Sequence, residues 1–213
     1  MEPVVIADLF AGQVETRWPG KASSAIRKLP VEGRHHLSFT GLSNDAQADL
    51  DAHGGFEKAL HHYPADHYAD WQSELGENVR FRPGGFGENL STNSLTETRV
   101  CIGDVFRIGS ACLQISQGRQ PCWKLAEHTK LERMAFLVRK SLRTGWYYRV
   151  LEEGEIAAGD LLTLEERPNP DWTVQAVTQA YFNPKIEVPV ARELAGLPHL
   201  FQGWKDSFLE RAL

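Results

Sequence analysis

Residues 116–125 read SQGRQPCWKL, and along this stretch the pattern of the chain changes from strand to helix. An apolar, strand-like run ends here, Gly118 and Pro121 interrupt regular structure, and a helix-like run follows Cys122. Arg119 precedes the cysteine, and the first N–H groups of the expected helix would face its sulfur. Both features favour the thiolate, which is the form that attacks carbon or binds soft metals. Cys122 is therefore the candidate for chemistry, and the alternative is a helix-start residue with no chemical role.

The other cysteines, Cys101 and Cys112, lie in apolar strand-like contexts, where cysteine is usually a small buried hydrophobic residue. An odd total of three cysteines, in a sequence without a signal-peptide pattern, predicts a reducing, cytoplasmic location rather than a disulfide framework. No apolar run approaches the roughly 18 residues that would span a membrane. We therefore expect a cytoplasmic protein with no membrane partner.

The length and composition are those of an ordinary folded protein. A chain of 213 residues has room for one good-sized domain and a small addition. The hydrophobic share of 42% and the charged share of 24% are typical of globular proteins. The net charge of −5 argues against a general nucleic-acid-binding role and leaves the oligomeric state open.

Residues 1–166 show loose alternation of apolar and polar positions, with Gly or Pro about every eight to twelve residues, as in barrels. Strands are expected at residues 4–10, 23–26, 36–39, 79–81, 98–102, 105–108, 111–116, 146–151 and 161–165. Helical spacing predicts helices at 56–75, divided in two by Pro64, after Cys122, and at 131–142. The predicted fold is mainly β with α.

A domain boundary is expected at the sequence RPNP, residues 167–170. Everything beyond it has helical character, with helices expected at 173–182, 188–197 and 200–212. We therefore predict a β-rich domain at 1–166 and a three-helix domain at 167–213. The smaller domain either stabilises the larger one or covers a site on it.

Polar clusters in loops are the other candidates for function. They are RKLPV at 27–31, GLSNDAQAD at 41–49, HGG at 53–55 and RPGGFGENL at 82–90. Glycine pairs let backbone N–H groups approach an anion, and basic side chains balance phosphate charge. Asn89 could bind a heterocycle edge as both donor and acceptor. Each cluster alone is more often a simple turn.

Common catalytic signatures are missing from the sequence. The histidine pairs at 35–36 and 61–62 lack the HExxH spacing of a zinc site. No phosphate-binding loop of the GxxxxGK[ST] type, no GxGxxG after a strand and no GxSxG elbow occurs. A zinc site is therefore disfavoured, and P-loop, Rossmann and serine-hydrolase functions have no support.

The order of these segments resembles the MOSC family, named for the C-terminal domain of molybdenum cofactor sulfurases. The matching segments are KLPV at 28–31, GLSNDAQAD at 41–49, HGG at 53–55, FGENL at 86–90, IGD at 102–104 and RQPC at 119–122. With the helical C-terminal part, essentially the whole chain resembles the YiiM-type branch of stand-alone MOSC proteins. The resemblance implies a MOSC-type β-barrel domain at 1–166 followed by a three-helix (3-alpha) domain at 167–213.

The resemblance also implies a cofactor, the molybdenum cofactor (molybdopterin carrying molybdenum). The family's cysteine corresponds to Cys122, which is the expected thiolate ligand of the metal and the expected catalytic residue. The candidate cofactor-binding residues follow from the positions of the motifs. They are Lys28, Arg34, Asp45, His53, Gly54, Gly55, Gly87, Glu88, Asn89, Arg119 and Cys122.

The activity that the resemblance implies is reduction of N-hydroxylated substrates, such as the toxic base analogue 6-N-hydroxylaminopurine, to amines. The sequence has no flavin or nicotinamide motif and no cysteine set for an iron–sulfur cluster. We therefore expect a separate flavoprotein reductase as electron donor. Two alternatives remain: a sulfur carrier or transferase that holds a persulfide on Cys122, and a non-enzymatic carrier of the molybdenum cofactor.

Overall fold

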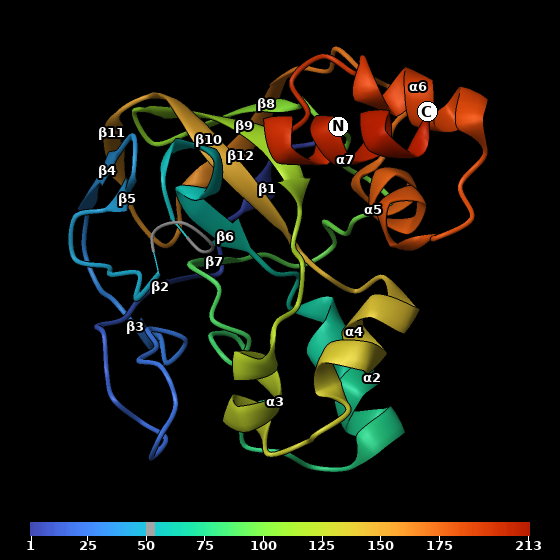
Figure 1. Cartoon of the computed structure of the whole chain (residues 1–213). Coiled ribbons are helices and arrows are strands. Elements are labelled where there is room, and N and C mark those ends of the chain that lie inside the picture. The colour runs from blue at the N-terminus through green and yellow to red at the C-terminus, as the bar shows by residue number, and fades with distance from the viewer. Residues whose placement is uncertain (50–53) are drawn as a thin grey trace.

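A nine-stranded sheet forms the centre of the computed structural model, which describes residues 1–49 and 54–213 (Figure 1). Its strand order is β1 (Val4–Val5), β12 (Leu161–Glu166), β8 (Val105–Ile108), β9 (Ala111–Gly118), β10 (Trp146–Glu152), β6 (Leu60–His62), β7 (Leu90–Ser91), β2 (Asp8–Ala11) and β3 (Leu29–Pro30). Only β6 and β7 pair in parallel among the described strands. The sheet forms a half-barrel, and a smaller sheet has the order β11 (Gly154–Ile156), β4 (His35–Ser38) and β5 (Gly41–Leu42).

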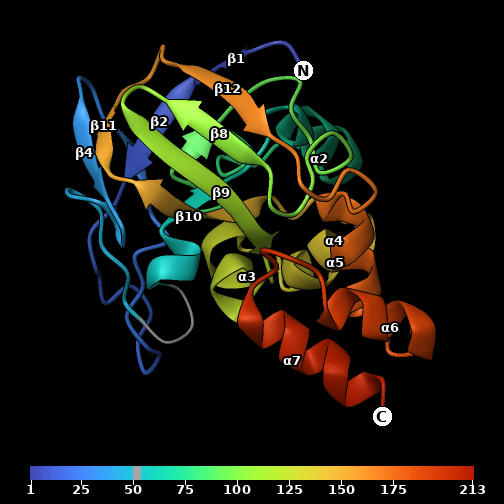
Figure 2. The ribbon, with the colours of Figure 1, turned by 90° about the horizontal axis from the view of Figure 1, so that it is seen from above.

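The helices form two groups on different sides of the sheet. The first group is α2 (Asp66–Leu75), α3 (Trp123–Thr129) and α4 (Met134–Ser141), and a short 3₁₀ turn, η1 (Phe56–Lys58), precedes β6. The second group is α5 (Val174–Phe182), α6 (Val188–Ala195) and α7 (Gln202–Arg211), which lies beside the end of β9 (Figure 2). This arrangement confirms the predicted mainly β fold with α. No helix in the described ranges is long and apolar enough to cross a membrane.

The hydrophobic core passes from the sheet into the C-terminal helices without a break. All eight residues of β9 are buried, because β8 and β10 flank the strand and α5 packs against it. Trp146 and Tyr148 of β10 belong to the same apolar cluster as Val177 of α5 and Trp204 and Phe208 of α7. Three short helices bury little area on their own, so this shared core is what stabilises them.

A second aromatic cluster lies under α2 and α3. Phe86 is fully buried at its centre, and its ring lies 4.7 Å from that of Tyr63 and 5.3 Å from that of Tyr68. Trp71 of α2 donates a hydrogen bond of 2.7 Å to the Tyr63 hydroxyl. This cluster fixes the loop before β7, which borders the candidate site.

Some of the helices and strands predicted from the sequence differ from those in the structure. The first half of the helix expected at 56–75 is wrong, because residues 60–62 form β6, whose partners are β10 and β7. Pairing with distant strands overrides helical spacing there. The strands expected at 23–26, 79–81 and 98–102 are also wrong: these are turns and isolated bridges. Cys101 and Cys112 are buried, as predicted.

Close contact between β9 and α5 joins the C-terminal helices to the sheet. A Cβ atom at Gly118, the last residue of β9, would overlap the hydroxyl of Thr178. Thr178 is fully buried, and its Oγ1 has no hydrogen-bond partner in the described part of the chain. The glycine is therefore required by the approach of α5.

We predict that Gly118→Ala lowers the free energy of unfolding by about 1–3 kcal/mol, because the added methyl group overpacks this contact. Gly196→Ala is the matched control, since its Cβ would meet its nearest neighbour at an ordinary 3.6 Å. Urea denaturation of both variants measures the difference. The double variant Gly118→Ala/Thr178→Ala should regain part of the loss, and equal stability of Gly118→Ala and the parent would contradict this reading.

Candidate functional site

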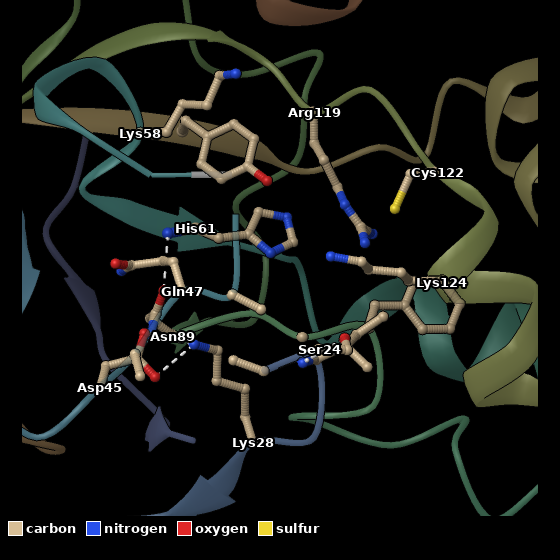
Figure 3. Close-up of a pocket in the computed structure, with 17 residues that line it drawn as sticks. Ser24, Lys28, Asp45, Gln47, Lys58, His61, Asn89, Arg119, Cys122 and Lys124 are labelled. Carbon is tan, nitrogen blue, oxygen red and sulfur yellow. Dashed lines mark hydrogen bonds and ion pairs between the residues drawn. The ribbon is translucent and has the colours of Figure 1, made fainter. Parts of the chain in front are cut away.

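A pocket lies where the loop before β3, the loop after β5, strand β6, the loop before β7 and the segment after β9 meet (Figure 3). Its apolar lining includes Ile26 and Phe86. Its polar lining is Ser24, Lys28, Asp45, Gln47, Lys58, His61, Asn89, Arg119, Cys122, Lys124 and Tyr147. Segments far apart in the sequence thus contribute to one cavity.

Asn89 connects three of these segments through its side chain. Its Oδ1 accepts a hydrogen bond from the backbone N–H of His61, at 3.2 Å. Its Nδ2 donates to the backbone oxygen of Phe10 at 3.2 Å and to Asp45 Oδ2 at 2.9 Å. The amide thereby joins β6, β2 and the loop after β5. Among the described residues, these hydrogen bonds hold the floor of the pocket in place.

Lys28 and Asp45 form a buried ion pair on this floor. Side-chain exposures of 6% and 1% show that both charges are removed from water. Burial lowers the pKa of the Lys28 ammonium, and the negative charge of Asp45 opposes that shift. The backbone N–H of Gly12 also donates to Asp45, at 2.7 Å. The charge of the Asp45 carboxylate is therefore balanced by Lys28, so Asp45 does not neutralise a second cation of the pocket.

His61 is a neutral imidazole facing this pocket. Burial lowers its pKa well below 6.5, and the positive charges of Arg119 and Lys28 lower it further. Its Nε2 is buried and has no hydrogen-bond partner among the described residues. A buried polar atom without a partner costs free energy, so it is a natural contact for a bound ligand.

Arg119 and Lys124 bring positive charge to the side of the pocket where Cys122 lies. Both are buried, with 5% and 7% of their surfaces exposed, and neither pairs with a carboxylate in the described part of the chain. Arg119 is hydrogen-bonded to the Tyr147 hydroxyl, whereas its Nη1 is buried and unpaired. The side chains of Arg119, Cys122 and Lys124 point toward one another in Figure 3.

Cys122 is placed by the end of β9 and the start of α3. The Arg119 N–H donates to the backbone oxygen of Gly145 at 3.0 Å, which continues the contact with the neighbouring chain after β9 ends. The backbone oxygen of Cys122 then accepts from Leu125 N–H at 3.1 Å, in the first turn of α3. The thiol is partly exposed and lines the pocket. The predicted change from strand to helix around Cys122 is confirmed.

Gly87 and Glu88 act on the loop before β7 in different ways. Gly87 has a φ of 79°, and a Cβ there would lie 2.8 Å from Ile26 Cγ1, so only glycine brings this backbone to the pocket. Glu88 is fully buried behind the lining, where it accepts hydrogen bonds from Tyr68 and from the N–H groups of Gly84 and Phe86. Burial raises the pKa of Glu88, and these hydrogen bonds oppose the rise.

The structure brings together most, but not all, of the residues expected from the sequence. The expected residues that line the pocket are Lys28, Asp45, Gly87, Asn89, Arg119 and Cys122. Arg34 does not join them: it is exposed and pairs with Asp160 at 3.2 Å. Gly54 and Gly55 precede η1 and are not lining residues, and His53 lies outside the described residues.

Sequence reasoning missed His61, Lys124 and Tyr147 as lining residues. The sequence suggests no role for His61 beyond an unsupported zinc site, and its spacing predicts a helix where the structure has strand β6. Lys124 follows Cys122 by two positions, so the position of the cysteine motif was an available signal for it. Tyr147 pairs with His61 across β10 and β6, which no local pattern reveals.

Metal-ligating side chains are scarce around this pocket. The described residues contain no group of three or more His, Cys, Asp or Glu side chains arranged to hold a metal ion. Cys122 is the one cysteine that lines the pocket within the described ranges. A metal bound here would therefore have to carry most of its own ligands.

Residues 49–163 match the MOSC domain, and residues 172–211 match the YiiM-like, 3-alpha helix domain. The chain belongs to the MOSC family. MOSC domains are generally associated with binding of the molybdenum cofactor. Protein YiiM of Escherichia coli (strain K12) is 37% identical over 207 residues, covering 97% of this chain and 92% of that protein.

Two further relatives match nearly the whole chain. The crystal structure of YiiM from Geobacillus stearothermophilus has a TM-score of 0.84 and 29% identity, covering 99% of this chain and 100% of that one. A protein named Reductase from Gibberella moniliformis (strain M3125 / FGSC 7600) is 36% identical over 200 residues. That match covers 92% of this chain and 36% of the longer relative.

We predict that acid weakens the fold through His62, the residue after His61. Burial lowers the pKa of His62 from 6.5 to about 3, so the folded chain keeps it neutral while the unfolded chain takes up a proton below pH 6.5. The free energy of unfolding should therefore be insensitive to this group above pH 6.5. It should fall by about 1.4 kcal/mol per pH unit between roughly pH 6 and 3.

Urea denaturation at pH 7 and pH 5 measures the fall in stability, and NMR of the histidine rings assigns it. The His62 ring is hydrogen-bonded to the hydroxyls of Tyr148 and Thr92, at 3.1 and 2.9 Å, so both nitrogens of the neutral ring have a partner. A His62 ring that titrates near pH 6.5 in the folded protein would show that the explanation is wrong.

Proposed function

We propose that this protein is a molybdenum-cofactor-dependent oxidoreductase that reduces N-hydroxylated compounds, such as 6-N-hydroxylaminopurine, to amines. The observation that carries the proposal is a single thiol in a pocket where the buried cations Arg119 and Lys124 have no carboxylate partner among the described residues. Membership of the MOSC family supports the cofactor. The relative named Reductase supports an oxidoreductase role.

The residues of the pocket fit such a cofactor. Molybdopterin is anionic through its phosphate and its sulfur atoms, and it brings sulfur ligands for its metal. A pocket with one thiol and no further set of metal-ligating side chains among the described residues suits a metal delivered in this form. The unpaired Arg119 Nη1 and His61 Nε2 are buried polar atoms that a bound ligand would satisfy.

Each group of residues has a distinct task in this proposal. Cys122 supplies the protein thiolate to the metal. Arg119 and Lys124 provide the positive charge for the phosphate, and the neutralised Lys28–Asp45 pair provides polar groups for the edge of the pterin. The backbone at Gly87 allows close approach of a planar ring, and Asn89 keeps the floor of the pocket in place.

The molybdenum cofactor, when bound, supplies the two-electron chemistry that removes the hydroxyl oxygen from the substrate nitrogen. The chain's own contribution lies in positioning and hydrogen bonding near Cys122. Burial raises the pKa of Tyr147, so its phenol stays protonated at neutral pH and is available as a hydrogen-bond donor to a ligand. His61 stays neutral in the same range, so it offers a donor or an acceptor but no positive charge.

Electrons must come from outside this chain. The sequence contains no flavin or nicotinamide motif. We therefore propose a separate flavoprotein reductase as the donor. The match covers 36% of the longer relative named Reductase. In that protein, a region similar to this chain is therefore joined to additional sequence in one polypeptide.

We predict that Cys122→Ala folds normally but binds molybdenum at least about tenfold more weakly, because it removes the protein ligand. Cys112→Ala is the matched control, since Cys112 is buried in β9 away from the pocket. Elemental analysis of both variants and the parent, purified anaerobically from a cofactor-producing host, gives molybdenum per chain. Reduction of 6-N-hydroxylaminopurine with a chemical electron donor gives the activity.

Unchanged molybdenum and turnover in Cys122→Ala would contradict the proposed ligand. A metal-free parent with cyanide-releasable sulfur on Cys122 would instead favour the sulfur carrier or transferase. Stoichiometric molybdenum without turnover, in the presence of a competent donor, would favour the non-enzymatic cofactor carrier.

A further inference from the structure

A second cavity opens on the other side of Cys122. Cys122, Lys58 and Tyr147 line both this cavity and the pocket described above, so the two spaces meet at the thiol. Its remaining wall comes from the end of β9, from α4 and from α5. A molecule in the second cavity would therefore lie next to whatever Cys122 binds.

Aromatic rings form the far wall of this second cavity. Tyr181 and Phe182 lie at the end of α5, in the C-terminal helices, and Tyr147 faces them from β10. The guanidinium of Arg139, from α4, lies 4.6 Å from the centre of the Phe182 ring. Aromatic faces together with a guanidinium plane are the surfaces on which planar bases stack.

The wall is rigid because three contacts hold α5 against β9 and α7. Thr178 contacts Gly118 of β9, and Tyr181 stacks on Trp204 of α7 with ring centres 4.0 Å apart and planes 9° from parallel. Arg211 donates a hydrogen bond of 2.8 Å to the backbone oxygen of Tyr181. Preformed aromatic walls lose little conformational freedom when a ligand binds.

Amide groups supply the polar side of the cavity. Gln117, in β9, is 1% exposed, and its Oε1 is buried without a hydrogen-bond partner in the described part of the chain. Gln120 also lines the cavity, and it is exposed. A glutamine amide both donates and accepts, which suits the edge of a nitrogen heterocycle. No carboxylate occurs among the described lining residues, so the cavity favours a neutral or anionic ring over a cation.

We propose that the second cavity is the substrate subsite and that it selects planar nitrogen heterocycles by stacking against Phe182 and by hydrogen bonding to Gln117. This inference rests on the proposed function, since it supplies the place from which a substrate reaches the group held by Cys122. It also gives the C-terminal helices a part in binding, in addition to their contribution to stability. Figure 2 shows α4 and α5 next to each other at this place.

The test compares Phe182→Ala and Gln117→Leu with Gln179→Ala, a control on the exposed side of α5 outside both cavities. The first readout is binding of adenine, the product of 6-N-hydroxylaminopurine reduction, to the full chain by calorimetry. Phe182→Ala should weaken adenine binding about tenfold through lost stacking, and Gln179→Ala should leave it unchanged. Molybdenum content should stay at the parent level in all three variants.

The second readout is selectivity. Phe182→Ala should lower kcat/KM for 6-N-hydroxylaminopurine about tenfold more than for hydroxylamine, which is too small to stack. Adenine that fails to bind the parent, or that binds the parent and Phe182→Ala equally, overturns the subsite. The parent could bind adenine in a way that depends on Phe182 and yet show no turnover. This result would support the subsite and contradict only the proposed reductase activity.

Discussion

The hydrogen bonds of one side chain, Asn89, hold the candidate site together. The amide links β6, β2 and Asp45, and Asp45 in turn neutralises the buried Lys28. The site is assembled from segments that are distant in sequence. The pocket therefore depends on a few buried polar groups whose hydrogen bonds hold these segments together. Removing one partner from such a network is costly, because it leaves a buried charge or amide without compensation.

The balance of charge follows from this arrangement. Asp45 forms an ion pair with Lys28, so Arg119 and Lys124 remain without a carboxylate partner in the described chain. Buried cations without partners are expensive, and a bound anion would offset the cost. The thiol of Cys122, the proposed soft ligand, lines the same pocket as these groups. A fixed excess of positive charge next to one thiol is the physical basis for preferring an anionic, metal-carrying ligand to a bare metal ion.

The sequence predicted the mainly β fold with its C-terminal helices and the change from strand to helix at Cys122, because these depend on local patterns. It also predicted Lys28, Asp45 and Asn89 as candidates, through motifs. It failed at 60–62, where strand pairing with β10 overrides helical spacing. Arg34, also a candidate from the motifs, does not line the pocket and pairs with Asp160, which is distant in sequence.

The second cavity could not be predicted from the sequence, since it is formed by β9, α4 and α5 only after the C-terminal helices pack on the sheet. Both cavities meet at Cys122, so direct bonding between this residue and molybdenum is the central claim. X-ray absorption at the molybdenum edge, on protein with selenocysteine at position 122, tests it most directly. We predict a selenium neighbour of molybdenum. Full molybdenum content with only sulfur and oxygen neighbours would contradict the claim.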